Sequence, residues 1–119
     1  MAPPVRTAIV IGAFAASGVV HLVRPGVFEP VIPPVLGDPT PWVIGSGVAE
    51  LVCAAGLATR QPWAPAATTG ALAVVWVGNV HMALGFHRSR RPAWQKAAAW
   101  ARLPLQVPLM WAAWTSPRR

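Results

Sequence analysis

Four long apolar stretches alternate with short runs of proline and arginine along this chain. The apolar stretches cover residues 6–23, 42–59, 65–86 and 94–114. A helix that crosses a bilayer needs roughly 20 mostly apolar residues, and each stretch is close to that length. Proline and arginine at the boundaries end helices and suit the membrane interface. The pattern therefore predicts an all-α, integral membrane four-helix bundle that forms a single transmembrane domain over residues 1–119.

The segment between the first two stretches has a different character. It carries six prolines between residues 25 and 41, which exclude a long helix. Its apolar residues nevertheless recur at nearly helical spacing: Val27, Phe28, Val31, Ile32, Val35 and Leu36. We therefore predict a short interfacial or re-entrant element that folds back over the bundle. A proline-stiffened loop is the alternative.

Small residues predict where helices approach each other closely. Gly12 and Ala16 are four residues apart in the first stretch, and Gly45 and Ala49 are four apart in the second. This spacing places small residues on one face of a helix and lets two backbones come together. We therefore expect these positions to be close contacts with neighbouring helices.

Composition supports a membrane setting. Hydrophobic residues make up 55% of the chain and charged residues only 11%, whereas about a quarter of a soluble domain is charged. The net charge is +7, and most basic residues stand between the apolar stretches, where they suit contact with anionic headgroups. The expected partner is therefore the lipid bilayer, and no nucleic acid is expected. The alanine-, proline- and arginine-rich composition is typical of a GC-rich bacterial genome, which predicts a multi-pass protein of the bacterial cytoplasmic (inner) membrane.

Eight of the polar side chains within the apolar stretches form the candidate site. They are Ser17, His21, Ser46, Glu50, Asn79, His81, Arg102 and Gln106. Polar residues are costly in lipid, usually face the bundle interior and often mark function. At about 1.5 Å per residue, Glu50 and Arg102 lie roughly 12 Å below the same interface, and both histidines and Asn79 lie in the same half of the bilayer. The sequence therefore predicts a polar cluster on the side of the proline-rich segment.

Pairings within this cluster follow from charge and helical geometry. A carboxylate and a guanidinium at one depth predict an ion pair between Glu50 and Arg102, because an unpaired charge there is costly. Arg102 and Gln106 are four residues apart and share a helix face. Asn79 and His81 are two apart and point to nearly opposite sides.

The cluster is compatible with three roles. It can be a hydrogen-bonded core that holds the helices in register, or a cavity for a small molecule, a lipid or a quinone. A redox, metal or proton-exchange role is the third, for instance axial haem ligation by His21 and His81. Cys53 is the only cysteine, and metal-ligand, nucleophile and nucleotide-binding motifs are absent. We therefore expect no metal site and no enzymatic activity of the chain on its own.

The order of several short motifs resembles that of DoxX-like membrane proteins. The motifs are Ser17-Gly18-Val19-Val20-His21 with Pro25, Phe28 and Ile32-Pro33-Pro34, then Ser46-Gly47-Val48-Ala49-Glu50-Leu51 with Ala55-Gly56-Leu57, then Asn79 with Met82, and finally Arg102-Leu103-Pro104-Leu105-Gln106 with Trp111. The resemblance covers about residues 12–114. It implies a four-helix membrane bundle, mostly without assigned chemistry. Some members of that family are named for a thiosulfate:quinone oxidoreductase subunit, and others are linked to redox homeostasis or to assembly of partner proteins.

The expected function is that of an accessory or partner-binding subunit with a polar intramembrane cavity built on Glu50 and Arg102. The chain lacks the paired cysteines of a thiol-redox carrier, which favours this role. One alternative is a quinone-interacting membrane subunit of an oxidoreductase, with quinone or haem as cofactor. The other is a small-molecule or proton carrier. We expect a protein partner or self-association, because so small a bundle has little core of its own.

Overall fold

A computed structural model describes residues 2–29 and 32–118 and shows an all-α chain. Its elements are α1 (Val5–Val23), η1 (Pro25–Val27), η3 (Pro34–Leu36), α2 (Pro39–Ala58), α3 (Ala64–His87) and α4 (Ala93–Trp114), where η denotes a 3-10 helix. Four helices are present, as predicted, and their bounds differ from the predicted ones by three residues or fewer. The largest difference is at α2, which begins at Pro39 because Asp38 caps it. The Asp38 Oδ1 accepts a hydrogen bond from the Thr40 N–H at 3.0 Å.

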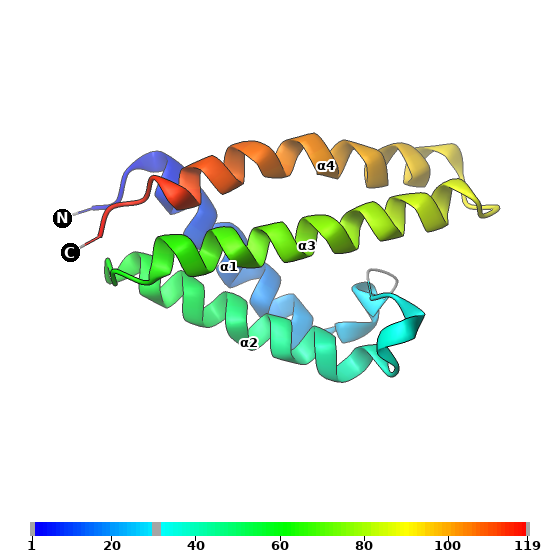
Figure 1. Cartoon of the computed structure of the whole chain (residues 1–119), viewed down its shortest axis with the longest axis horizontal. Coiled ribbons are helices and arrows are strands. Elements are labelled where there is room, and N and C mark those ends of the chain that lie inside the picture. The colour runs from blue at the N-terminus through cyan, green and yellow to red at the C-terminus, as the bar shows by residue number, and fades with distance from the viewer. Residues whose placement is uncertain (1, 30–31, 119) are drawn as a thin grey trace.

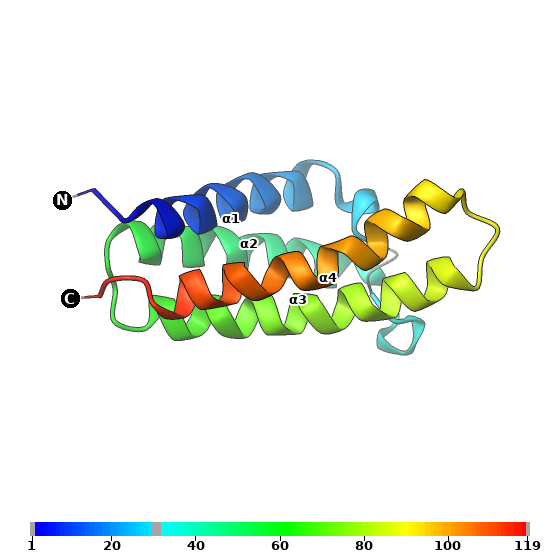
Figure 2. The same cartoon turned by 90° about the horizontal axis from the view of Figure 1, so that it is seen from above.

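The four helices run alternately up and down along the longest dimension of the molecule, which measures 48 Å (Figure 1 and Figure 2). Both termini and the α2–α3 turn lie at one end, here called the terminal end. Residues 25–38 and the α3–α4 turn lie at the other, here called the loop end. α1 packs mainly against α2 and α3 mainly against α4, and the two pairs meet through α2 with α3 and α1 with α4. α2 and α4 are therefore diagonal to each other.

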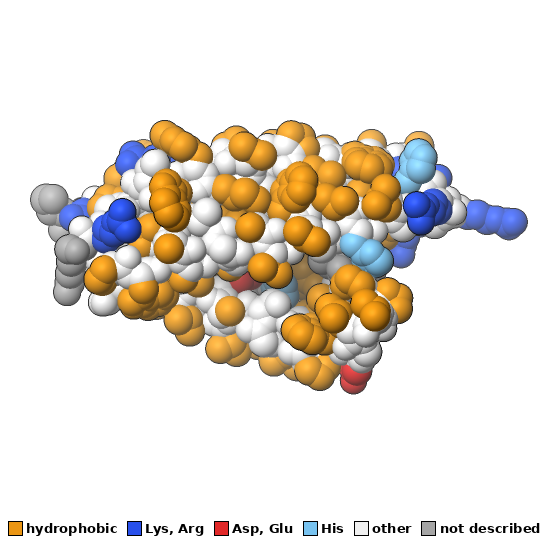
Figure 3. Space-filling view, in the orientation of Figure 1, with side chains coloured by type: hydrophobic (Ala, Val, Ile, Leu, Met, Phe, Trp, Pro, Cys, Tyr) orange, Lys and Arg blue, Asp and Glu red, His pale blue; other side chains and the backbone are white. Residues whose placement is uncertain are grey.

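Three helices, α1, α2 and α3, are long and apolar enough to cross a membrane. Their apolar surface points outward, since only 28%, 39% and 22% of their most apolar windows is buried. Figure 3 shows apolar side chains across the middle of one face, with lysine and arginine near both ends. Such a distribution indicates a membrane protein. Within the described chain, α4 is as long but is not among these candidates, because Gln95, Lys96, Arg102 and Gln106 lower its mean hydropathy.

Among residues 25–38, the described ones form two 3-10 turns, η1 and η3, at the loop end and no long helix. The start of α2 makes two hydrogen bonds to this segment. Trp42 Nε1–H donates to the Leu36 carbonyl at 3.0 Å, and Thr40 Oγ1–H donates to Glu29 Oε1 at 3.4 Å. Pro30 and Val31, which belong to the predicted element, lie outside the described residues. The prolines thus prevent a long helix, while tertiary contacts fold the segment over the helix ends.

α1 and α2 approach each other closely at two glycines. A Cβ added to Gly18 would lie 2.9 Å from the carbonyl oxygen of Gly47, and one added to Gly47 would lie 2.7 Å from His21 Cβ. Gly12 and Gly45, which the small-residue spacing predicted, have open space where a Cβ would go. The spacing therefore pointed to the wrong glycines, and the close contact lies at Gly18 and Gly47 instead. The reason is that small residues recur on several faces of these helices, so that spacing alone does not select one.

Polar side chains join α1 to the end of α4 at the terminal end. Arg6 donates to the side-chain and backbone oxygens of Thr115, each at 3.1 Å. The hydroxyl oxygens of Thr7 and Ser116 lie 2.9 Å apart. Because the Ser116 hydroxyl donates its hydrogen to the Ala112 carbonyl, Thr7 is the donor to Ser116. These bonds close the ring of four helices.

Two buried threonines are expected to have opposite effects on stability when each is replaced by valine. Thr68 in α3 and Thr7 in α1 are at most 1% exposed, but the Thr68 hydroxyl has no hydrogen-bond partner among the described residues. Thr68→Val is expected to raise the free energy of unfolding by about 1 kcal/mol, because it removes an unsatisfied buried hydroxyl. Thr7→Val is expected to lower it by about the same amount, because it removes the bond to Ser116. Chemical unfolding of both variants in one detergent measures the two shifts, and shifts of equal sign would contradict this geometry.

Candidate functional site

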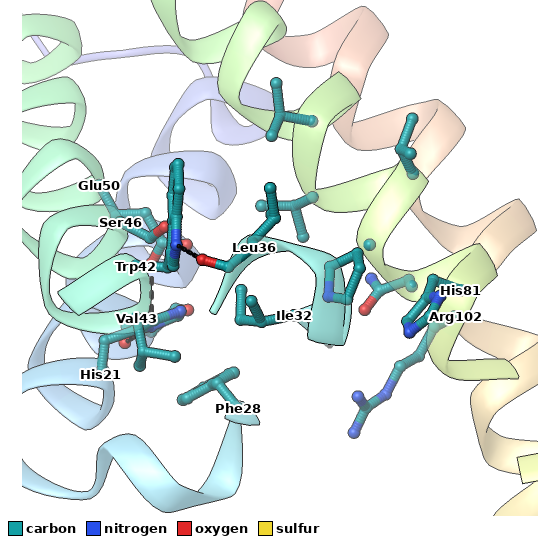
Figure 4. Close-up of a pocket in the computed structure, with 17 residues that line it drawn as sticks. His21, Phe28, Ile32, Leu36, Trp42, Val43, Ser46, Glu50, His81 and Arg102 are labelled. Carbon is teal, nitrogen blue, oxygen red and sulfur yellow. Dashed lines mark hydrogen bonds and ion pairs between the residues drawn. The ribbon is translucent and has the colours of Figure 1, made fainter. Parts of the chain in front are cut away.

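A cavity of about 420 Å³ lies between α2 and α3 beneath residues 25–38, and we call it the Glu50 cavity (Figure 4). Figure 3 shows the face hollowed in this region. Most of the wall is apolar. Seven of the eight predicted site residues line it, and they come from all four helices: Ser17, His21, Ser46, Glu50, Asn79, His81 and Arg102. An apolar cavity of roughly 300–1,000 Å³ with a few converging polar groups is typical of a small-molecule site.

His21 lies near the end of α1, where the contact with Gly47 brings it against α2. Its ring stacks on Phe28, with ring centroids 3.7 Å apart and planes inclined by 10°. Its Nδ1 lies 2.6 Å from the backbone carbonyl oxygen of Ser17. A carbonyl can only accept, so Nδ1 carries a hydrogen and donates it to Ser17. Backbone and aromatic contacts therefore set the orientation of the imidazole.

Glu50 faces His21 without a hydrogen bond to it. The Glu50 Oε2 lies 3.6 Å from His21 Nδ1, but the hydrogen on that nitrogen goes to Ser17. The Glu50 side chain is only 7% exposed. The Ser17 hydroxyl lies near its carboxyl group, but Oε2 has no partner among the described residues that meets hydrogen-bond geometry. Burying a polar group without a partner is unfavourable, and native proteins rarely do so without a reason. Because Glu50 is part of the cavity wall, a molecule in the cavity can supply the missing donor.

The predicted ion pair between Glu50 and Arg102 is wrong. Figure 4 shows Glu50 and His21 on one side of the cavity, and His81 and Arg102 on the opposite side. In the part of the chain that the structure describes, Glu50 lies within 4.0 Å of a basic nitrogen only at His21. The helical rise per residue predicts the same depth in the membrane for Glu50 and Arg102. However, α2 and α4 are diagonal in the bundle, so equal depth does not bring the two side chains together. Arg102 is exposed instead.

Asn79 and Gln106 pair across α3 and α4. The Asn79 Nδ2–H donates to Gln106 Oε1 at 3.0 Å, and both side chains are buried. One turn away, Trp76 Nε1–H donates to the Leu103 carbonyl at 3.0 Å. These bonds hold the α3 wall of the cavity onto α4, and Gln106 supports that wall from behind without lining it. His81 is exposed and Asn79 is buried, as expected for positions two residues apart on a helix, but both side chains line the Glu50 cavity.

The cavity wall also contains residues that the sequence did not single out as site residues. These are chiefly Phe28, Ile32, Leu36, Trp42 and Val43. Phe28 covers one face of His21, and Trp42 holds Leu36 in place. The near-helical apolar spacing in residues 27–36 was the sequence signal for Phe28, Ile32 and Leu36, since such spacing indicates a surface that turns inward. No such pattern pointed to Trp42 and Val43 as site residues.

The described residues contain no group of three or more His, Cys, Asp or Glu side chains that could hold a metal ion. Cys53 is a free thiol in the apolar core formed with Val10, Phe14 and Leu57. The polar groups that face the cavity therefore offer hydrogen bonds and ion pairing to a ligand, chiefly through Glu50.

A family model described as a domain of unknown function, DUF8561, matches residues 10–116, which is nearly the whole chain. No curated protein and no solved structure matches the chain. The assignment to DoxX-like proteins is therefore wrong, since the matching model is that of another family. The motifs behind that assignment are short and rich in glycine, alanine and leucine, which closely packed membrane helices use in general. By the extent of the match, the chain belongs to the DUF8561 family of unknown function.

Proposed function

We propose that this chain is a four-span integral membrane protein that binds a small, mainly apolar molecule carrying a protonated amine. α1, α2 and α3 are candidate spans on length and hydropathy. α4 has 22 residues, or about 33 Å at 1.5 Å per residue, which exceeds a hydrocarbon core of about 30 Å. Its buried amide, Gln106, is paired with Asn79, and Arg102 has the length to reach toward the interface. These features support a fourth span.

The observation that carries the ligand proposal is the buried, unpartnered Oε2 of Glu50. A carboxylate in an apolar wall needs an N–H or O–H donor, and a cation offsets the unfavourable burial of its charge best. The wall around it includes Phe28, Trp42 and Val43, so the remainder of a matching molecule is apolar. A short hydrocarbon group with a terminal ammonium meets both requirements.

Other roles for the cavity fit these contacts less well. In a purely structural core Glu50 would have a donor, as Gln106 has in Asn79. The carbonyl oxygens of an oxidised quinone accept hydrogen bonds, as a carboxylate does, so this form leaves Oε2 unsatisfied. Outward apolar faces suit lipid and partner proteins alike, so they do not by themselves favour an accessory subunit.

We place the protein in a bacterial cytoplasmic membrane with the α3–α4 turn on the cytoplasmic side. That turn contains Arg88, Arg90 and Arg91, and short basic loops favour the cytoplasm. Fusion of a reporter enzyme to the C-terminus tests the orientation, since the terminal end is then expected outside the cytoplasm.

Calorimetric titration in lipid nanodiscs tests the ligand class with three probes of equal chain length: hexylammonium, hexanol and hexanoate. Hexylammonium is expected to bind about tenfold or more tightly than hexanol, because a hydrogen bond to a charged group contributes about 1.5–3 kcal/mol. Hexanoate is expected to bind most weakly, since two carboxylates repel. Glu50→Gln is expected to remove the preference for the ammonium and to leave hexanol binding unchanged.

Glu29→Gln is the matched control, because it removes the same charge from a carboxylate outside the cavity wall. It is expected to keep the ammonium preference, and empty nanodiscs correct for partition of the probes into lipid. The proposal fails if Glu29→Gln and Glu50→Gln weaken binding equally, or if hexanoate binds as tightly as hexylammonium.

A further inference from the structure

A second depression opens at the loop end between α3, α4 and η1, and we call it the basic groove. Its volume is about 370 Å³. Arg91, Gln95 and Arg102 supply its polar wall, and Met82, Phe86 and Trp94 are the large apolar side chains that line it. Arg102 lines both the basic groove and the Glu50 cavity.

Arg91 is held against the wall of the groove. Its guanidinium carbon lies 4.0 Å from the centre of the Phe86 ring, and its Nη1–H donates to Gln95 Oε1 at 3.2 Å. A guanidinium has several further N–H donors, so most of them are free for a ligand. Because the Arg91 side chain is already oriented, binding of a ligand costs less side-chain conformational entropy.

Arg102 completes the cationic wall. It lies roughly 14 Å along α4, and its Cβ tilts toward the start of that helix, which is the loop end. Among the described residues, neither Arg91 nor Arg102 lies within 4.0 Å of a carboxylate, and no acidic residue lines the groove. A guanidinium near a membrane requires an anionic partner or water.

The sequence around the groove strengthens its positive potential. Residues 87–102 contain Arg88, Arg90 and Lys96 beside the two groove arginines, and they contain no aspartate or glutamate. The acids Glu29 and Asp38 are in residues 25–38 and do not line the groove. A concave surface of one sign attracts ions of the opposite sign.

We infer that the basic groove binds the phosphodiester headgroup of an anionic phospholipid. Two guanidinium forks match the geometry of phosphate oxygens. Trp94 is 70% exposed at the start of α4 and suits the headgroup level of a bilayer. Met82 and Phe86 offer apolar surface to the first part of an acyl chain, and basic pockets between membrane helices are known headgroup sites. The inference rests on membrane insertion, as proposed above, but not on a ligand in the Glu50 cavity.

Native mass spectrometry tests this inference on protein released from nanodiscs with equal amounts of phosphatidylglycerol and phosphatidylcholine of identical acyl chains. The protein is expected to retain phosphatidylglycerol preferentially. Arg91→Gln is expected to lower the apparent affinity for phosphatidylglycerol about tenfold and to leave that for phosphatidylcholine unchanged, because one charge-assisted contact is lost. Arg91→Lys keeps the charge but not the fork, so an intermediate loss is expected.

Arg88→Gln and Arg90→Gln are the controls, since each removes one charge from the same turn outside the groove. Each is expected to change the affinity less than about twofold, because salt screens exposed charges. Circular dichroism verifies that every variant keeps its helices.

If Arg88→Gln and Arg91→Gln lower the affinity for phosphatidylglycerol equally, the proposed site is overturned in favour of diffuse electrostatic attraction to the basic turn. Binding of inorganic phosphate in lipid-free detergent, dependent on Arg91 and without any preference for phosphatidylglycerol, would overturn the lipid assignment. The hexylammonium titration uses different variants, so that either proposal can fail while the other stands.

Discussion

Gly47→Ala is expected to lower the free energy of unfolding by about 2–3 kcal/mol, because α1 and α2 meet at this residue. The added Cβ would lie 2.7 Å from His21 Cβ and 3.0 Å from the Gly18 carbonyl oxygen. Neither atom belongs to the far end of a flexible side chain, so the two helices must separate. The loss exceeds the gain of about 0.5–1 kcal/mol that alanine has over glycine inside a helix.

Gly45→Ala is the matched control, in the same helix and two residues earlier. A Cβ at Gly45 meets nothing within 4 Å, so this change is expected to raise the free energy of unfolding by up to about 1 kcal/mol. Reversible unfolding in mixed micelles, followed by circular dichroism, measures both variants. A neutral or stabilising Gly47→Ala would show that the helices do not meet there.

Glu50→Leu is expected to raise the free energy of unfolding by about 1–3 kcal/mol and to abolish hexylammonium binding. A buried carboxylate with an unpartnered oxygen is replaced by an apolar side chain of similar size in a mainly apolar wall. His21 loses no hydrogen bond in this exchange, because its Nδ1–H is donated to Ser17. The opposite signs of the effects on stability and on binding are the expected mark of a carboxylate kept for a ligand.

Asn79→Leu tests the same wall with the opposite expectation for stability. It removes the donor to Gln106 and leaves a buried amide oxygen unsatisfied, so a loss of about 1–3 kcal/mol is expected. Unfolding of both variants in one detergent gives the comparison. If Glu50→Leu destabilises the protein as much as Asn79→Leu, Glu50 is a structural partner of His21 and the ligand proposal loses its support.

The sequence predicted the four helices and their bounds well, because two physical limits act locally. Apolar length determines which stretch can become a spanning helix, and prolines such as Pro25, Pro62 and Pro92 mark where a helix stops or starts. Height along a helix is also local, since every residue adds about 1.5 Å. Seven of the eight predicted site residues accordingly line one cavity at the loop end.

Rotation about the helix axes and the choice of neighbours are not local properties. Glu50 and Arg102 share a height but stand on diagonal helices, so the predicted ion pair does not form. The glycines at the α1–α2 contact, Gly18 and Gly47, could not be told from Gly12 and Gly45 by spacing. Short motifs rich in small residues also misled the family assignment, which the match over residues 10–116 corrected.

The sequence by itself determined four helices, an apolar exterior and the depth at which polar residues occur, because apolar length, prolines and helical rise act within one segment. Only the tertiary structure decided that His21 donates to Ser17, that Glu50 is left with an unpartnered oxygen, and that Arg102 lies across the cavity from Glu50 and also lines a second, basic groove. Those outcomes depend on which helices are neighbours and on how residues 25–38 close the loop end. Both are set by packing between segments that are distant in the sequence.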